Sequence, residues 1–289
     1  MAKYLLIDGY NLAFRAYYGM PDLTTSDGFP TGILHGWVRT LWMIEDMEGP
    51  AEFGAYFDSG AAEREALDAD YKANREAAPE DLDKQMPLVK GITAAMGIPV
   101  IEKEGLEADD LLAASAIHLA EAGHEAVMVS ADKDLGQVVR PGITQLLPPP
   151  TANPKVGWRR LDAGGVEQKF GIPPARIPDY LALVGDTSDN VPGLKGVGPK
   201  TAVTWLTEYG DLEGIIAKAN YVKPPRFQQP LADYAERLRL NLKIVTLDTD
   251  QEPVVFEDYS PDVDKLVALL ESVEMKTAAR DARKRYGTA

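Results

Sequence analysis

The sequence predicts an α/β fold, in which a mainly parallel central sheet is flanked by helices and followed by a helical domain. Short apolar runs alternate with helical patterns through the first half of the chain, which is typical of a parallel sheet. After about Leu161 the pattern becomes helical, with a glycine-rich turn at 193–200. The composition agrees, because 289 residues with 45% apolar side chains can bury a large core and a smaller second one.

Four apolar segments are predicted to be strands: Tyr4–Ile7, Phe53–Phe57, Pro99–Ile101 and Ala126–Val129. The helices predicted between them cover about 31–47, 81–96 and 109–122. The helix that begins at Asp109 is apolar almost all round, so we expect it to pack on the sheet. These patterns place a first domain at 1–165 and a helical domain at 166–289.

The residue content restricts the chemistry that this chain can perform. It has no cysteine and three histidines, which excludes disulfides, thiolate nucleophiles and cysteine-ligated zinc. No apolar run approaches the roughly 20 residues that cross a bilayer, and Met1–Tyr10 is too short for a secretory signal, so we expect a cytoplasmic protein without membrane contact. The net charge of −15 is unusual for a nucleic-acid binder, although bound divalent cations would offset part of it.

Nine carboxylates stand where predicted strands end or where helices begin. They are Asp8, Asp58, Glu107, Asp109, Asp110, Asp132, Asp134, Asp186 and Asp189. Because parallel strands end at the same edge of a sheet, we expect the first seven to lie together, joined by the last two from the helical part. A single Asp after a strand is often only a turn former, and one at a helix start can complement the helix dipole. All nine in this arrangement favour a metal site.

The ligand chemistry of these acids indicates which metal would bind. Oxygen ligands without histidine or cysteine favour a hard ion, Mg²⁺ or Mn²⁺, over Zn²⁺. Two such ions about 4 Å apart would activate a water and stabilise the leaving oxygen of a phosphodiester. The sequence therefore predicts metal-assisted hydrolysis without a protein nucleophile.

An ordered set of motifs makes the chain recognisable: Leu6–Gly9, Phe14–Tyr17, Phe57–Asp58, Tyr71–Arg75, Glu107–Asp110, Asp132–Leu135, Gly185–Gly193 and Gly196–Ala202. With these motifs the chain resembles the 5′–3′ exonuclease domain of bacterial DNA polymerase I and the wider flap endonuclease family. The resemblance covers about residues 4–215. It implies a PIN-like nuclease domain and a metal-dependent enzyme that hydrolyses DNA near 5′ ends, leaving 5′-phosphates, in primer removal and repair.

The resemblance also implies roles for the nine carboxylates, all of which fall at the family's metal-ligand positions. Asp8, Asp58, Glu107 and Asp109 would be nearer the first ion, and Asp132, Asp134, Asp186 and Asp189 nearer the second. Asp110 belongs to the same ligand set. Asp8, Asp109, Asp132 and Asp186 also count among the catalytic residues.

In the family, the stretch equivalent to about 59–80 forms a helical arch through which a single-stranded 5′ end passes. Lys72 and Arg75 in this stretch would clamp the scissile phosphate and offset charge in the transition state. Without the resemblance, the same pattern indicates a solvated charged helix. Arg15 matches a position that holds the substrate, and Tyr71 would either stack on a base or pack locally.

One departure from the family lies at the base of this arch. Glu63 precedes Arg64 where an aromatic residue is usual, so we expect the arch base to pack differently.

The glycine-rich turn at 193–200 is the second implied contact with DNA. Gly196 and Gly198 permit a tight turn with exposed N–H groups, and Lys200 is placed to meet a phosphate. In the family this helix-hairpin-helix-like turn binds the duplex backbone, often with a K⁺ ion held by loop carbonyls, and Thr201 belongs to the same motif. The alternative is a plain connection between two helices.

Two other functions remain open at the level of sequence. A PIN-type ribonuclease would use a similar acidic site, and a non-catalytic junction-binding protein would keep the glycine-rich turn and lose metal ligands. We expect DNA with 5′ flaps, nicks or recessed 5′ ends as the partner. We also expect a monomer, associated with the nucleoid and functionally linked to a DNA polymerase. The chain ends where a fused polymerase would begin, so we expect a stand-alone nuclease.

Overall fold

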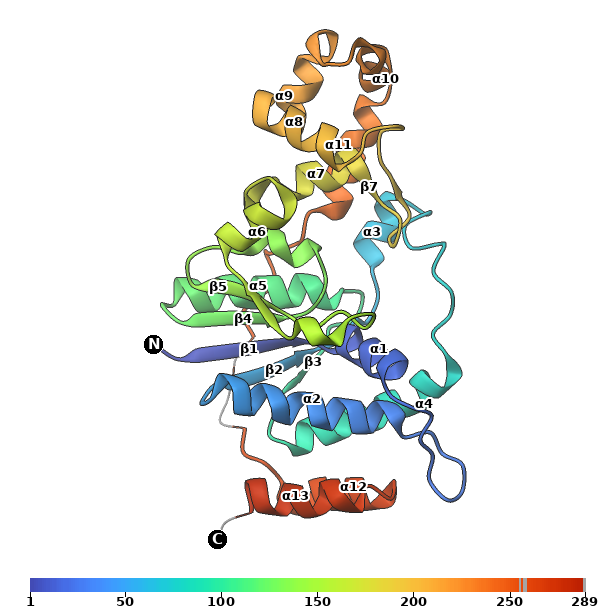
Figure 1. Cartoon of the computed structure of the whole chain (residues 1–289), viewed down its shortest axis with the longest axis vertical. Helices are drawn as coiled ribbons and strands as arrows, with labels where there is room; N and C mark the ends of the chain where they lie inside the picture. The colour runs from blue at the N-terminus through green and yellow to red at the C-terminus, as the bar shows by residue number, and fades with distance from the viewer. Residues whose placement is uncertain (255, 257–258, 288–289) are drawn as a thin grey trace.

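The computed structural model describes residues 1–254, 256 and 259–287. The molecule is elongated, with a sheet at its middle and a helical part at one end (Figure 1). The strands of the main sheet are β1 Lys3–Asp8, β2 Glu52–Tyr56, β3 Val100–Ile101, β4 Glu125–Val129, β5 Ile143–Leu147 and β6 Arg159–Leu161. The helices of the same part are α1 Gly9–Gly19, α2 Gly32–Glu48, α3 Ala62–Leu67, α4 Glu80–Ala95 and α5 Ala108–Glu121.

The sheet confirms the predicted α/β fold. Its strand order is β3-β2-β1-β4-β5-β6, and every pairing is parallel except β5 with β6. The chain runs from β1 outward to β3 and then crosses to β4 on the other side of β1. This crossing creates a switch point between β1 and β4, where loops diverge and a cleft can form at the carboxyl ends of the strands.

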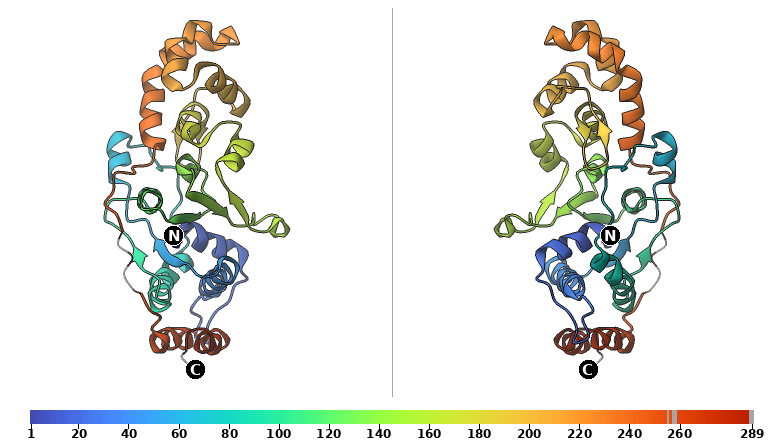
Figure 2. Two further views of the ribbon diagram at one scale, coloured as in Figure 1. Left: turned by 90° about the vertical axis from the view of Figure 1, so that its left-hand side faces the viewer. Right: turned by 90° about the vertical axis from the view of Figure 1, so that its right-hand side faces the viewer.

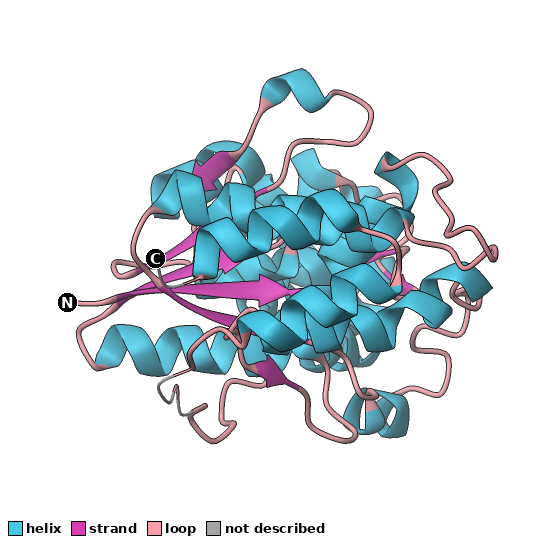
Figure 3. Cartoon of the chain, turned by 90° about the horizontal axis from the view of Figure 1, so that it is seen from below, coloured by secondary structure: helices cyan, strands magenta, loops and turns pink. Residues whose placement is uncertain are grey.

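Helices cover both faces of the sheet (Figure 3). Side chains alternate between the faces along β1, so Leu5 and Ile7 join the core under α2 and α4. Leu6 faces the opposite side and packs with Leu112 of α5. The expectation that the apolar helix from Asp109 packs on the sheet is therefore confirmed.

Strands β5 and β6 were not predicted from the sequence. Strand β5 is buried, and its Gln145 breaks the apolar run that would have identified it. Gln145 is accommodated because its Nε2 donates to the main-chain oxygens of Ser130, at 3.1 Å, and Asp132, at 2.5 Å. The β5–β6 hairpin projects from the body of the molecule (Figure 2).

The helical part follows the sheet in the chain. Its elements are α6 Ala163–Phe170, α7 Ile177–Val184, α8 Pro199–Tyr209, α9 Leu212–Ala217, α10 Gln228–Asp233 and α11 Ala235–Val245. A small hairpin of β7 Gly185–Asp186 and β8 Val191–Pro192 lies between α7 and α8. Leu181 of α7 and Trp205 of α8 belong to the same apolar cluster as Leu112, so one core joins the helical part to the sheet.

The last two helices, α12 Val263–Ser272 and α13 Lys276–Tyr286, lie at the opposite end of the molecule from α8–α10 (Figures 1 and 2). Leu266 and Leu270 share the core under α2 and α4. The phenol of Tyr286 accepts a hydrogen bond from Trp42 Nε1 at 3.0 Å. Helices α12 and α13 therefore pack on the sheet part rather than on the helical part, because the apolar face of α12 lies in the same core as the buried residues of α4. The division at 165/166 stays a prediction, and residues 288–289 lie outside the described residues.

Candidate active site

The carboxyl ends of β1 and β2 position the first two acids. Asp8 ends β1 and caps α1, because its Oδ1 accepts from Asn11 N at 3.1 Å. Its Oδ2 accepts from Ser130 Oγ at 2.6 Å, which links β1 to the end of β4. Asp58 follows β2, and its Oδ1 accepts from Ala108 N at 2.7 Å at the start of α5. Local helix-start contacts thus hold these carboxylates at the edge of the sheet.

The segment after β4 brings in the next pair. Asp132 Oδ1 accepts from Asp134 N at 2.8 Å, so the two residues form a tight turn before the 3-10 helix Asp134–Val138. Asp109 lies in the first turn of α5, beside them. Parallel strands have therefore gathered these acids as the sequence predicted.

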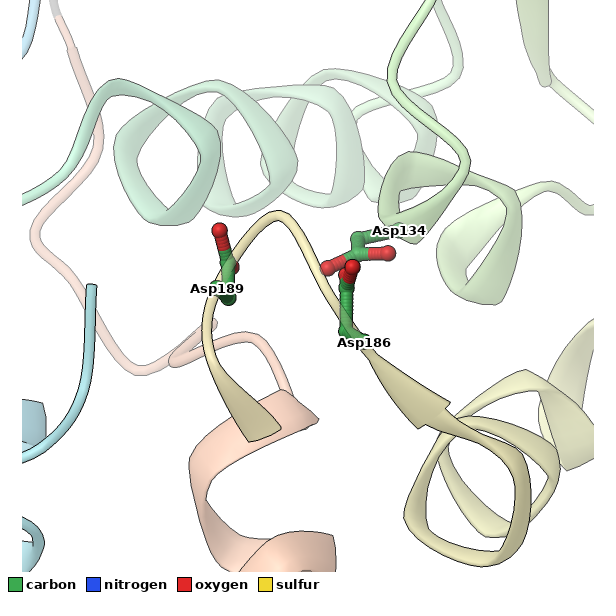
Figure 4. A group of neighbouring side chains, drawn as sticks. All are labelled: Asp134, Asp186 and Asp189. Atoms are coloured by element: carbon green, nitrogen blue, oxygen red, sulfur yellow. The ribbon is translucent and has the colours of Figure 1, made fainter. Parts of the chain in front are cut away.

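Two acids from the β7–β8 hairpin complete a second group. Carboxylate oxygens of Asp134, Asp186 and Asp189 all lie within 4.8 Å of one another (Figure 4). The hairpin requires glycine at 185, where φ is +84° and a Cβ would lie 2.4 Å from Gly193 N. Lys133 Nζ donates to Asp186 Oδ2 at 2.5 Å and neutralises part of the charge of this group.

The acids of this edge are electrostatically unbalanced. Burial raises the pKa of Asp8 to about 7, and the charges of Asp58 and Asp132 add to the shift. Burial, followed by the charge of Asp132, raises the pKa values of Asp109 and Asp134 well above their usual range. The Oδ1 atom of Asp134 is buried without a hydrogen-bond partner among the described residues. A bound cation would lower these pKa values and would give Asp134 Oδ1 a partner. The carboxylate oxygens of this edge therefore fit a hard metal ion.

Glu107 and Asp110 have different surroundings, because Arg64 from α3 contacts both. Arg64 Nη1 lies 2.5 Å from Glu107 Oε2 and 2.6 Å from Asp110 Oδ2. Arg64 Nη2 donates to Asp110 Oδ1 at 2.7 Å. The structure therefore does not bring Asp110 to the open acids. Arg64 was not among the predicted site residues, and the unusual Glu63 directly before it was the signal that pointed to this part of the arch base.

The stretch 59–80, which we call the arch segment, holds Lys72 and Arg75 over the acids. Lys72, at a φ of +55°, pairs with Glu107, and Arg75 Nη2 donates to Asp189 Oδ1 at 2.6 Å. Between helix α3 and the start of α4 at Glu80, the structure describes no further α-helix in this segment, so the segment does not form a continuous helical arch.

Tyr71 in the same segment is buried, and its ring is not available to stack on a base. Its phenol donates toward Glu107 Oε2 at 3.1 Å and lies 3.2 Å from Asp189 Oδ2. Tyr71 therefore packs locally, which is one of the two alternatives that the sequence left open for it.

An open cleft of about 570 Å³ lies between the acids and the arch segment. Four acids of the predicted ligand set line it: Asp8, Asp58, Asp109 and Asp132. The arch segment contributes the cations Lys72 and Arg75 and one further acid, Glu76. The rings of Tyr10 and Phe14, which the sequence analysis did not place in the site, also line it. Their spacing of four residues on α1 was the signal that could have found them.

Arg15 points elsewhere. Its side chain is half-buried, and Nη1 lies 3.5 Å from Thr151 Oγ1 in the projecting hairpin.

The glycine-rich turn lies between α7 and α8. Gly196 has a φ of +85°, and Gly198 caps α8 with Pro199 as its first residue. Leu194 and Val197 are buried beneath the turn, while Lys200 is exposed. Gly198 and Pro199 thus place the start of α8 at the turn, and the helix-hairpin-helix-like motif stays a prediction.

Comparison with known proteins agrees with this geometry. Residues 3–171 match the 5′–3′ exonuclease N-terminal resolvase-like domain, and residues 172–281 match the 5′–3′ exonuclease C-terminal SAM fold. A 5′–3′ exonuclease of Aquifex aeolicus is 38% identical over 294 residues, covering 100% of this chain and 98% of the relative. DNA polymerase I of Rhizobium leguminosarum is 34% identical over 95% of this chain, which spans 28% of that protein.

A solved structure shares the same fold. The flap endonuclease of bacteriophage T5, in complex with DNA and metal ions, has a TM-score of 0.70 and 20% identity, covering 98% of each chain. Among the described residues, no helix is long and apolar enough to cross a membrane. Together, the fold, the acidic edge and the matches over both parts show that the chain belongs to the 5′–3′ exonuclease family.

Proposed function

We propose that this chain is a divalent-metal-dependent 5′–3′ exonuclease and structure-specific flap endonuclease that cuts DNA near 5′ ends and leaves 5′-phosphates. The open cleft carries the proposal, because it combines acids from separate strands with the cations Lys72 and Arg75. The name of the Aquifex relative and the DNA and metal ions in the T5 structure support the same activity.

The metal would be Mg²⁺, with Mn²⁺ able to substitute, because every donor at this edge is an oxygen. When bound, such ions lower the pKa of a water and neutralise charge on the phosphodiester. Asp8, Asp58, Glu107 and Asp109 would hold one ion, and Asp132, Asp134, Asp186 and Asp189 the other. The Oδ1 atom of Asp134, which is buried without a hydrogen-bond partner among the described residues, supports this assignment.

The residues of the cleft that are not acids would hold the substrate. Lys72 pairs with Glu107 and Arg75 pairs with Asp189, and a phosphate would compete with these acids for both cations. The rings of Tyr10 and Phe14 line the same cleft, where a single-stranded base can stack against them. Arg15 would contact the strand at the side of the projecting hairpin.

The glycine-rich turn would bind the duplex away from the scissile bond. The positive end of α8, which begins at this turn, and the ammonium of Lys200 suit phosphate oxygens, and such contacts position DNA without reading its sequence. Loop carbonyls of this turn are candidates for a K⁺ ion. In this proposal the protein works as a monomer on flaps, nicks and recessed 5′ ends, in the nucleoid, alongside a DNA polymerase in primer removal and repair.

Two rival functions make different demands on the site. A PIN-type ribonuclease would normally lack the Gly196–Lys200 module, which is intact here. A non-catalytic junction-binding protein would not need the crowded, partly buried acids, since their mutual repulsion destabilises the fold. Neither rival explains the acids and the turn together.

A 5′-labelled flap DNA incubated with the protein in Mg²⁺ or in EDTA tests the proposal. We expect cutting near the flap base that requires Mg²⁺ and disappears in Asp132→Ala. A second flap substrate whose 5′ strand is RNA, tested in parallel, distinguishes the proposed function from that of a PIN-type ribonuclease. Binding without cutting in both Mg²⁺ and Mn²⁺ would favour the junction-binding function instead.

A further inference from the structure

Arg64 occupies a buried junction at the base of the arch segment. Its side chain is 11% exposed, and its guanidinium contacts two acids of the predicted ligand set. In addition, Nε donates to Ile244 O at 2.8 Å, and Nη2 lies 3.3 Å from Thr246 O at the end of α11. All three nitrogens of the guanidinium therefore have partners, and the network leaves none of them for a phosphate.

The partners of Asp110 are equally complete. Arg64 contacts both carboxylate oxygens, in the bidentate arrangement that is the strongest for such a pair. Asp248 N adds a third hydrogen bond, to Oδ1, at 2.8 Å. The residue is only 2% exposed. Asp110 thus has its own fixed cation, and a metal ion would have to compete with Arg64 for it.

The neighbouring Asp109 shows the opposite condition. It lies one position earlier on α5, and a one-residue step turns the side chain by about 100° around the helix axis. Asp109 lines the open cleft, and no cationic side chain of the described residues forms an ion pair with it. Adjacent acids of one motif therefore serve two purposes.

The position of Arg64 also joins three separate parts of the chain. It extends from α3 in the arch segment to α5 at the sheet and to the main chain at the end of α11. A second ion pair, Arg237 Nη2 to Asp68 Oδ2 at 2.5 Å, connects α3 with α11 nearby. Movement of the arch base would break both links at once.

We propose that Arg64 is a positioning residue and Asp110 its counter-ion, so that this pair fixes the arch base and Asp110 is not a metal ligand. The pair holds Glu107 at the edge of the acid group through the shared Nη1 atom. The statement that Asp110 is not a metal ligand rests on the proposed function. The statement that the Arg64–Asp110 ion pair fixes the arch base does not, and it is testable without metal or DNA.

The experiment compares Asp109→Asn with Asp110→Asn in EDTA by thermal unfolding. Asp109→Asn removes one of several repelling charges, so we expect its Tm to rise by a few degrees (about 2 °C or more). Asp110→Asn leaves Arg64 buried with an incomplete partner, so we expect its Tm to fall by about 5 °C or more. A Tm of Asp110→Asn that is unchanged or raised would overturn the counter-ion role of Asp110.

Mn²⁺ titration by calorimetry then tests the metal ligands, with the double variant Arg64→Gln/Asp110→Asn keeping the net charge of the site unchanged. We expect the double variant to bind Mn²⁺ within about threefold of the parent, because Lys72 and the Tyr71 phenol still contact Glu107. Asp109→Asn should bind at least about tenfold more weakly. Equal losses in the two proteins would make Asp110 a metal ligand and overturn the inference. If none of the proteins, including the parent, binds Mn²⁺, the proposed function fails while the Tm comparison still decides the ion pair.

Arg64→Lys tests positioning, because lysine keeps the charge but cannot make the bidentate contact. We expect kcat on flap DNA to fall about tenfold with KM within about twofold, and hydrogen exchange to become faster across 62–75. An unchanged kcat together with unchanged exchange would leave Arg64 a merely structural residue.

Discussion

The acidic edge of the sheet and the glycine-rich turn are built in opposite ways. The edge collects carboxylates from Asp8 to Asp189, holds them partly buried, and keeps several pKa values raised. The turn uses a few consecutive residues, Gly196–Thr201, that lead into α8, with the side chain of Lys200 exposed to solvent. Chemistry on a phosphodiester needs charges fixed at defined places by a core, whereas holding a duplex backbone needs only accessible donors.

The largest expected effect separates chemistry from binding. Asp132→Ala should lower the single-turnover rate of flap cleavage roughly 10³-fold, because an acid of the site is lost. Affinity for the same DNA in EDTA should change less than about threefold. The matched control is Asp264→Ala, an exposed acid on α12 far from the cleft. A rate within tenfold of the parent would remove Asp132 from the proposed site.

Lys72 belongs to the acidic edge by its contacts, although it is a cation. Lys72→Ala should slow single-turnover cleavage by about 10²-fold and leave duplex affinity nearly unchanged, since it would act on the scissile phosphate. Lys84→Ala, which removes an exposed lysine paired with Glu80, serves as its control. Cleavage at the parent rate would refute a catalytic role for Lys72.

The turn should show the reverse behaviour. Lys200→Glu is expected to weaken DNA affinity about tenfold and to reduce the salt dependence of binding by about one phosphate contact. Its single-turnover rate at saturating enzyme should stay close to that of the parent. Lys265→Glu makes the same charge change at an exposed residue of α12 and controls for the change in net charge. If Lys200→Glu loses cleavage at saturation instead, the turn and the edge do not have separate roles.

The smallest effect concerns pH and stability. The folded pKa of Asp8 is raised to about 7, so in EDTA the folded protein binds a proton that the unfolded chain has released above pH 4. Stability from this group is therefore lost as pH rises toward 7, and Tm should fall by a few degrees (about 3 °C) between pH 5 and pH 8. Saturating Mg²⁺ should reduce the fall, because metal favours the deprotonated carboxylate. Asp8→Asn should flatten the EDTA profile; an unchanged slope would show that Asp8 does not cause it.

Much of the site follows from local sequence. Apolar runs predicted β1 to β4, and acids directly after those runs could be assigned to one edge because parallel strands end together. Gly196, Gly198 and Pro199 specify the turn and the start of α8 through their own backbone preferences. These features depend on neighbours within a few positions, so they can be predicted from the sequence.

Other features depended on contacts between distant segments. Strand β5 was not predicted because the carbonyls that satisfy buried Gln145 come from Ser130 and Asp132. Helices α12 and α13 fall within the predicted helical domain, 166–289, and only the structure shows that their apolar faces pack on the sheet part.

The division among the nine acids is the clearest case. Asp109 and Asp110 are the same residue type at adjacent positions, and the resemblance gave both the same role. The tertiary structure places Arg64, 46 positions away from Asp110, against one of them and leaves the other in the cleft. Sequence alone determined which side chains carry charge and which strands they follow. Only the fold decided which charges meet, because Coulomb energy depends on distance in space and on burial rather than on separation along the chain.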